Sequence, residues 1–210
     1  MNNNMQNEVL NIIEKRYSTR QFAESAPELE TIIKVAEAGI LAPFGSATGF
    51  SREEVRKVFI LAPKSDGRGK FVEILHGQLL KNSKELSFAS IFIPKLKSFA
   101  KLVDGLVKNG IPGLEQGTYV IIIAEKKGFP PVAKQSIAHA LQNMWIYATS
   151  LLLGFQMLSA IGTLGKNKEI FDLLGLEFAK YELDGCLVGI PADANTNRKF
   201  DISKSIKVIP

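Results

Sequence analysis

The segment Val132–Leu153 constrains the fold of this chain more than any other stretch of its sequence. Its apolar side chains recur every three to four residues, and few charges follow Lys134. This spacing predicts one long helix that is apolar over most of its circumference. Such a helix must be covered on all sides, so it lies either at the centre of a large domain or in a subunit interface.

Three short apolar runs predict buried strands, at 58–62, 119–124 and 186–190. The second run is β-branched and continuous, as in a strand buried on both faces. Helical patterns cover residues 8–15 and 29–40. Helices outnumber strands and the strands are interspersed among them, so we expect an α+β fold with one sheet covered by helices.

Length and composition are compatible with a single domain over residues 1–210, because 46% of the 210 residues are hydrophobic. The single cysteine, Cys186, excludes an internal disulfide framework and a cysteine-ligated iron–sulfur cluster within one chain. With only two histidines, a zinc site would need carboxylates and an unusual geometry. We therefore expect no metal site.

The chain carries a net charge of +5, which suits nucleic acid, an anionic membrane surface or an anionic cofactor. Its basic residues are spread out, with no run of five or six like charges. We expect no nucleic-acid partner and no membrane partner; a nucleic-acid binder is the least favoured alternative. The polar residues 1–7 lack the apolar region of a secretory signal, so we expect a cytoplasmic protein.

The segment Arg16-Tyr17-Ser18-Thr19-Arg20 carries two guanidinium groups around two hydroxyls, directly after the first predicted helix. Arginine forks match phosphate oxygens bidentately, and Ser and Thr hydroxyls add short donors. The segment therefore suits a fixed phosphate. The structural alternative is a helix C-terminus whose arginines complement the helix dipole and whose Ser and Thr form a turn.

Three further segments leave two interpretations each. Residues 42–46 hold Pro and Gly, and form either a plain linker or a place where a ligand approaches the backbone. In Ser83–Asn109 the second half predicts an amphipathic helix, whereas the aromatic and apolar first half is core, a lid or part of a substrate pocket. The basic tail 194–210 has too few large residues to fold alone, so it is either frayed or packed on another surface.

The order of these features resembles the FMN-dependent nitroreductase family over nearly the whole chain. The first helix ends in Arg16–Arg20 and the next reaches Ala42-Pro43; the long helix ends at Gly154, a loop with Gly162 follows, and a strand closes in Gly189-Ile190-Pro191. The two ends of the chain match best. The middle of the chain, from about Ser65 to Gly117, matches the family only in its length and its general residue pattern.

The resemblance implies a helix-rich, three-layer α/β/α domain with a mixed central sheet. It also implies an obligate homodimer with FMN at the subunit interface. The helix at 132–153 would then be central to that interface. Residues 194–210 would form a C-terminal arm that packs on the partner subunit.

The resemblance also implies a set of cofactor-binding residues. Arg16 and Ser18 would contact the FMN phosphate, Arg20 the pyrimidine edge of the isoalloxazine, and Tyr17 would belong to the same site. The other subunit would contribute Pro43, Phe44, Gly45 and Ser46; Gly162 would offer a backbone N–H near flavin N5, and either Arg198 or Lys199 would be a second phosphate ligand. No general acid, nucleophile or metal ligand is assigned.

The implied activity is electron transfer from NADH or NADPH, through FMN, to a nitroaromatic, a quinone or a similar small acceptor. Two departures from the family pattern bear on it. The family commonly has Ser, Asn and Gln-Pro-Trp after Ala-Pro, where this chain has Phe44–Phe50, and its common acidic residue before the glycine near N5 is Ile161 here. The changed segment motivates an alternative function, a flavin-binding sensor or carrier without turnover.

Overall fold

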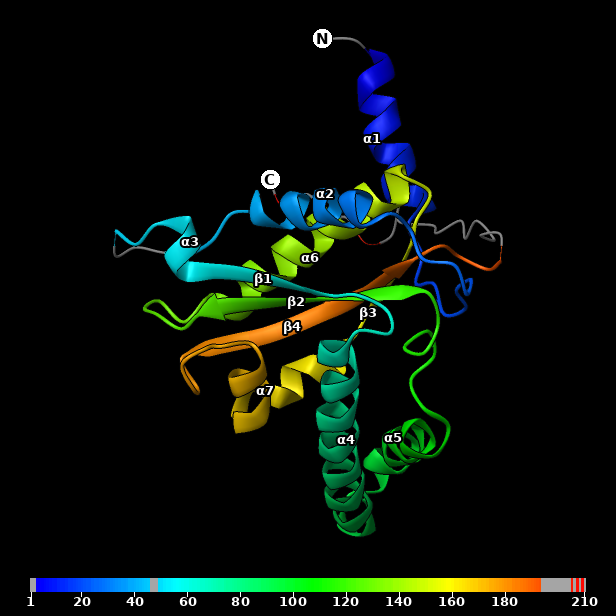
Figure 1. Ribbon diagram of the computed structural model, residues 1–210, viewed down its shortest axis with the longest axis vertical. Helices are drawn as coiled ribbons and strands as arrows, with labels where there is room; N and C mark the ends of the chain where they lie inside the picture. The colour runs from blue at the N-terminus through cyan, green and yellow to red at the C-terminus, as the bar shows by residue number, and fades with distance from the viewer. Residues whose placement is uncertain (1–2, 46–48, 194–204, 206, 208, 210) are drawn as a thin grey trace.

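The computed structural model describes residues 3–45, 49–193, 205, 207 and 209 (Figure 1). In chain order the elements are α1 (Asn3–Lys15), α2 (Leu29–Ile40), α3 (Arg52–Val55), β1 (Arg56–Leu61), α4 (Asp66–Phe92), the 3-10 helix η1 (Pro94–Leu96), α5 (Lys97–Asn109), β2 (Thr118–Lys126), α6 (Ala133–Ser150), β3 (Gly154–Met157), the 3-10 helix η2 (Ser159–Lys166), α7 (Lys168–Leu173) and β4 (Tyr181–Gly189). Within this part of the chain, no helix combines the length and the apolarity needed to cross a membrane.

The four strands form one sheet in the order β1-β2-β4-β3, and each neighbouring pair is antiparallel. The expectation of a mixed sheet is therefore wrong for these strands. Two helices in contact, α4 and α5, connect β1 to β2 and return the chain to the end of the sheet where β1 stops, so β2 runs back along β1. Parallel pairing occurs at an isolated bridge between Ser18 and Phe155.

The sheet separates two hydrophobic cores, which gives the three layers expected (Figure 1). Side chains alternate along β2, so Ile121 and Ile123 pack on the α2 and α6 side while Val120 and Ile122 pack on the α4 and α7 side. This burial on both faces explains why residues 119–124 form an uninterrupted apolar run.

Helix α6 is amphipathic. Ile137, Leu141, Met144 and other apolar side chains of this helix are buried on the sheet. Gln135, Ala138, His139, Gln142 and Asn143 form an exposed stripe along the opposite face. The prediction of a helix apolar over most of its circumference is thus wrong, because polar and small residues recur at helical spacing between the apolar ones.

The segment 83–109 forms the second half of α4, then η1 and α5. Figure 1 shows this pair of helices extending away from the sheet. Phe88, Ile91 and Phe92 are 67%, 69% and 72% exposed, so the core interpretation of the first half is wrong. The second half forms the amphipathic helix that was predicted. The lid interpretation stays a prediction.

Candidate functional site

The segment 16–20 leaves α1 and runs along the outer edge of the sheet, next to β3. Thr19 N–H donates to the Phe155 carbonyl at 3.0 Å, and Phe155 N–H donates to Thr19 Oγ1 at 3.3 Å. These two bonds bury Thr19 against the strand. Because successive side chains of an extended segment point to opposite sides, Ser18 and Arg20 are left exposed on the other side.

The guanidinium of Arg16 is held in place by an aromatic stack. Its Cζ lies 4.2 Å from the centroid of the Trp145 ring, and that ring stacks on Phe155 with a centroid separation of 5.0 Å. Trp145 Nε1–H also donates to the Tyr17 carbonyl at 3.2 Å. A cation over an indole face is attracted by the ring quadrupole, so the arginine is fixed without a carboxylate partner.

Arg16 Nε is buried and has no hydrogen-bond partner among the described residues. Within the same part of the chain, neither Arg16 nor Arg20 forms an ion pair with a carboxylate. A buried donor without a partner is costly in a folded protein, unless a ligand satisfies it. The segment therefore presents unpaired positive charge and an exposed hydroxyl at one end of the edge strand.

The turn at 42–45 lies near the other end of α6. Gly45 N–H donates to Ser136 Oγ at 3.0 Å, and a Cβ on Gly45 would clash with Val132. Ser136 and Trp145 are nine positions apart on α6, which corresponds to about 13 Å along the helix. Within one chain the turn is therefore separated from Arg16 by about half the length of α6.

A buried arginine fixes this turn. Arg56 forms an ion pair with Glu125 at 2.7 Å, and both side chains are at most 1% exposed. The same guanidinium donates to four backbone carbonyls, those of Gly39, Ala42, Pro43 and Ser136. One cation thus joins the end of α2, the turn, the sheet and the first turn of α6.

Gly162 lies in η2, beyond the end of β3. It lines a cavity of about 260 Å³ together with Lys134, Ile137, Leu183 and Asp184. Burial raises the pKa of the Asp184 carboxyl, and a hydrogen bond from Gly185 N–H opposes that rise. Across the described residues, no group of three His, Cys, Asp or Glu side chains is arranged to hold a metal ion.

The edge strand β3 connects the segment 16–20 with the 3-10 helix η2 that contains Gly162. Phe155 lies beside Ser18, and the chain enters η2 only four residues later. At about 3.3 Å per residue, the Arg16–Arg20 segment and the start of η2 are separated by about 13 Å along this edge. The spacing suits an elongated ligand with an anionic group at one end and a ring system at the other.

The sequence profile of the Nitroreductase family matches residues 13–192. The chain belongs to the nitroreductase family. No curated protein matches this nitroreductase in sequence.

Solved structures with the same fold include FMN-bound members. A Bacteroides fragilis nitroreductase with bound FMN has a TM-score of 0.71 at 20% identity, covering 97% of this chain and 99% of the other. A Desulfitobacterium hafniense nitroreductase with bound FMN has a TM-score of 0.70 at 19% identity, with 100% of both chains covered. Iodotyrosine deiodinase bound to FMN and 3-iodo-L-tyrosine has a TM-score of 0.63 at 16% identity, covering 96% and 97%. At these identities the likeness concerns the fold.

The predicted site residues of this nitroreductase fall in three places. Arg16, Tyr17, Ser18 and Arg20 lie together at the edge of the sheet, Gly162 lies past the end of β3, and Pro43, Phe44 and Gly45 lie near the beginning of α6. Ser46, Arg198 and Lys199 lie outside the described residues, as does most of the segment 194–210. The structure thus brings the first group together and separates it from the turn within one chain.

Sequence reasoning missed the residues that hold this arrangement. The helical spacing of 132–153 places Trp145 only on the apolar face of that helix, and none of the predicted motifs includes Arg56. A signal existed in each case, because Trp145 is the single tryptophan and Arg56 is a charged residue beside a predicted buried strand. Neither signal identifies its partner, since the contacts join segments far apart in the sequence.

Proposed function

We propose that this nitroreductase is an FMN-dependent oxidoreductase that passes electrons from NADH or NADPH to a small acceptor such as a nitroaromatic or a quinone. The observation that carries the proposal is the Arg16 guanidinium, which is fixed over Trp145 with a buried, unsatisfied Nε–H. In a family with FMN-bound structures of the same fold, an unsatisfied cation of this kind suits the FMN phosphate.

The residues present fit the phosphate end of FMN. Arg16 supplies a preset fork, Ser18 an exposed hydroxyl and Arg20 a second cation two residues further along the same edge. Charge-assisted hydrogen bonds to phosphate are shorter and stronger than neutral ones. We propose that Arg16 and Ser18 bind the phosphate, that Arg20 reaches the pyrimidine edge of the ring, and that Tyr17 borders the same site.

When bound, FMN supplies the redox chemistry, taking up a hydride and passing electrons on. The protein's residues bind and orient it. A guanidinium beside the ring, as proposed for Arg20, would favour uptake of negative charge by that ring. We propose that Gly162, which is exposed and has no side chain, offers its backbone N–H to the ring near N5.

We further propose that each site is built from two copies of the chain, with the turn 42–45 of one copy, and Ser46 after it, meeting the segment 16–20 of the other. The separation of about 13 Å along α6 prevents the two from meeting within one chain. Several large apolar side chains of α1 and α2 are exposed, namely Val9, Leu10, Ile13, Leu29, Ile33 and Ile40. Figure 1 shows both helices on the α6 side of the sheet, where a second copy would cover them. In this proposal Arg198 or Lys199, in the arm 194–210, adds a phosphate contact.

The first test is the absorbance of the purified protein between the near ultraviolet and the blue. We expect flavin bands and a released cofactor identified as FMN. A colourless protein that also fails to take up added FMN would contradict the proposal. Oxidation of NADH or NADPH with an added acceptor then separates an enzyme from a flavin carrier, because a flavin-loaded dimer without turnover would support the carrier alternative.

The assignment of Arg16 is tested separately. Arg16→Ala should weaken FMN binding by about 1.5–3 kcal/mol, the value of a charge-assisted contact. Lys15→Ala, one residue earlier at the end of α1, is the neighbouring control, and we expect a smaller effect because the site does not include it. Flavin titration by fluorescence quenching measures both, and unchanged affinity in Arg16→Ala would refute the assignment.

A further inference from the structure

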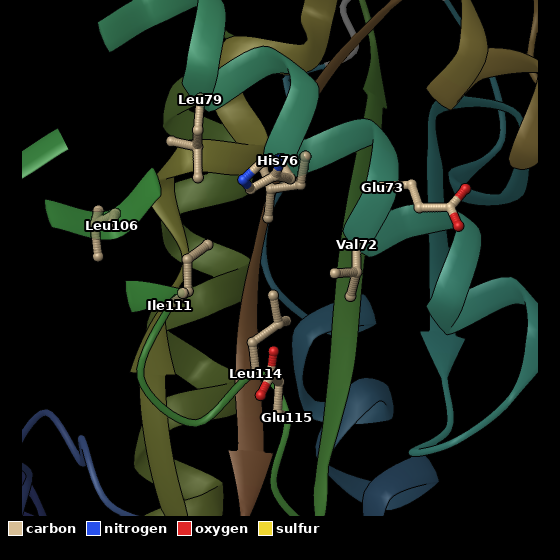
Figure 2. Close-up of a pocket in the computed structure, with 10 residues that line it drawn as sticks. Val72, Glu73, His76, Leu79, Leu106, Ile111, Leu114 and Glu115 are labelled. Atoms are coloured by element: carbon tan, nitrogen blue, oxygen red, sulfur yellow. The ribbon is translucent and has the colours of Figure 1, made fainter. Parts of the chain in front are cut away.

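A second cavity lies between α4, α5 and the loop 110–115, on the side of the sheet opposite to α6. Its volume is about 230 Å³ (Figure 2). The walls are apolar and come from three segments: Val72, Leu75 and Leu79 on α4, Leu106 on α5, and Ile111 and Leu114 on the loop. Since an engineered apolar cavity of about 150 Å³ binds benzene, this cavity has room for one substituted aromatic ring.

The loop wall is held in place by a buried arginine. Arg68 donates to the carbonyls of Leu114 and Thr118 and, at 3.1 Å, to Thr118 Oγ1. Thr118 Oγ1–H in turn donates to the Gly113 carbonyl at 2.7 Å. Gly110 begins the loop with a φ of 77°, a left-handed conformation that favours glycine. The cavity is therefore preformed, because its wall is bonded independently of any ligand.

Burial lowers the pKa of Arg68 to about 10. The guanidinium therefore stays protonated at neutral pH, and all of its partners named above are neutral oxygens. The charge of Arg68 faces the loop backbone. The Leu114 side chain lies between that backbone and the cavity, which it lines.

The ionisable side chains that line the cavity are those of Glu73, His76 and Glu115. His76 Nε2 lies 3.3 Å from the Val107 carbonyl, so Nε2 is the donor in this contact. Figure 2 shows the Glu115 carboxylate beside Leu114, whereas that of Glu73 points away from the cavity. No Lys or Arg is among the described residues that line it, although the chain carries a net charge of +5.

We propose that this cavity binds a small amphipathic amine, with its apolar group between α4 and α5, beside His76, and its ammonium group at the Glu115 carboxylate. An ammonium ion supplies only donors, which matches the acceptor oxygens of the Glu115 carboxylate, and its positive charge is favoured by the negative charge of that group. An anionic ligand of equal size is repelled by the Glu115 carboxylate and meets no Lys or Arg among the described lining residues. The site is distinct from the proposed flavin site and does not depend on it.

The test uses 2-phenylethylammonium as the probe and the ring signals of the two histidines in NMR spectra of the full chain. We expect the signals of His76 to shift in a saturable way during titration. Those of His139, on the exposed stripe of α6, should stay in place. A His139→Gln variant assigns the signals without altering the cavity. Absence of a saturable shift at His76 would overturn the proposal.

Matched probes and variants test the chemistry of the site. Phenylacetate, with a similar apolar group and the opposite charge, should bind at least about fivefold more weakly than the amine. Glu115→Gln should weaken amine binding by only about threefold, because the carboxylate is exposed and partly screened. Glu85→Gln, on the exposed face of α4 away from the cavity, should change nothing. Equal affinity for both probes would refute the assigned ligand class.

A cavity-filling variant tests the location. Val72→Phe places a ring in the cavity and should abolish the saturable shift, while Val9→Phe, on exposed α1, should leave it intact. Cooperative thermal melting establishes that each variant is folded. Amine binding that survives in folded Val72→Phe would place the amine elsewhere and overturn the proposal; if that variant does not fold, the His76 titration of the unmodified chain decides.

Discussion

Replacing Arg56 tests the buried network that fixes the turn 42–45. Arg56→Leu removes one member of an ion pair whose side chains are 0% and 1% exposed, and leaves Glu125 charged in the interior. It also removes the donor to four carbonyls. Loss of one partner from a buried ion pair costs about 3–5 kcal/mol. The total stability of a domain is about 5–15 kcal/mol, so the change should consume a large part of it.

The measurement is the free energy of unfolding from urea titrations followed by circular dichroism. Arg56→Leu/Glu125→Leu should be more stable than Arg56→Leu by about 1–2 kcal/mol, because it removes the unpaired charge but leaves carbonyls without a donor. Lys168→Met is the control for an ordinary ion pair, because Lys168 and Asp172 are 67% and 59% exposed, and should cost under about 1 kcal/mol. If Arg56→Leu costs no more than this control, the network does not hold the turn.

Substitutions at three further positions test the segment 16–20 and the cavity at Gly162. Trp145→Leu removes the ring beneath Arg16 and should weaken FMN binding about threefold to tenfold in a fluorescence titration, whereas Trp145→Phe should retain part of the affinity. Thr19→Val removes the hydroxyl that Phe155 N–H donates to and should lower the unfolding free energy by about 1 kcal/mol; an unchanged urea midpoint would contradict this. Asp184→Asn should become more stable relative to the unmodified protein as pH rises from acid to neutral. Burial raises the pKa of Asp184 in the folded state, so the stability that its carboxyl contributes is full below its unfolded pKa. That stability is lost as pH rises through its folded pKa. A stability difference that is independent of pH would refute the role assigned to its burial.

Elements with a strong local pattern could be predicted from the sequence. Residues 29–40 and 119–124 follow helical and buried-strand patterns, and both form the expected elements. The strand at Gly154–Met157 lies where the sequence predicts a loop with glycines, because it has only four residues and includes Gly and Gln. Its pairing with β4 spans about thirty positions of the chain, and no local pattern encodes such a contact.

The candidate residues of the segment 16–20 follow from the sequence as a prediction, whereas their geometry does not. The hydroxyls and guanidiniums of residues 16–20 were identified because Arg and Ser types in this order suit an anion. The position of Arg16 depends on Trp145, which is 129 positions later, and on a strand that was not predicted. A contact of this kind follows from packing, so it becomes visible only in the folded chain.

The position of the turn 42–45 near the start of α6 and of Arg16 near its end has a genetic consequence, given sites shared by two copies. A variant damaged at Arg16 and a variant damaged at the turn would each lose both sites as homodimers. A heterodimer of the two would have one site that carries both defects and one site that carries neither. Co-expression of two inactive alleles should therefore restore activity, which two alleles damaged at the same loop could not do.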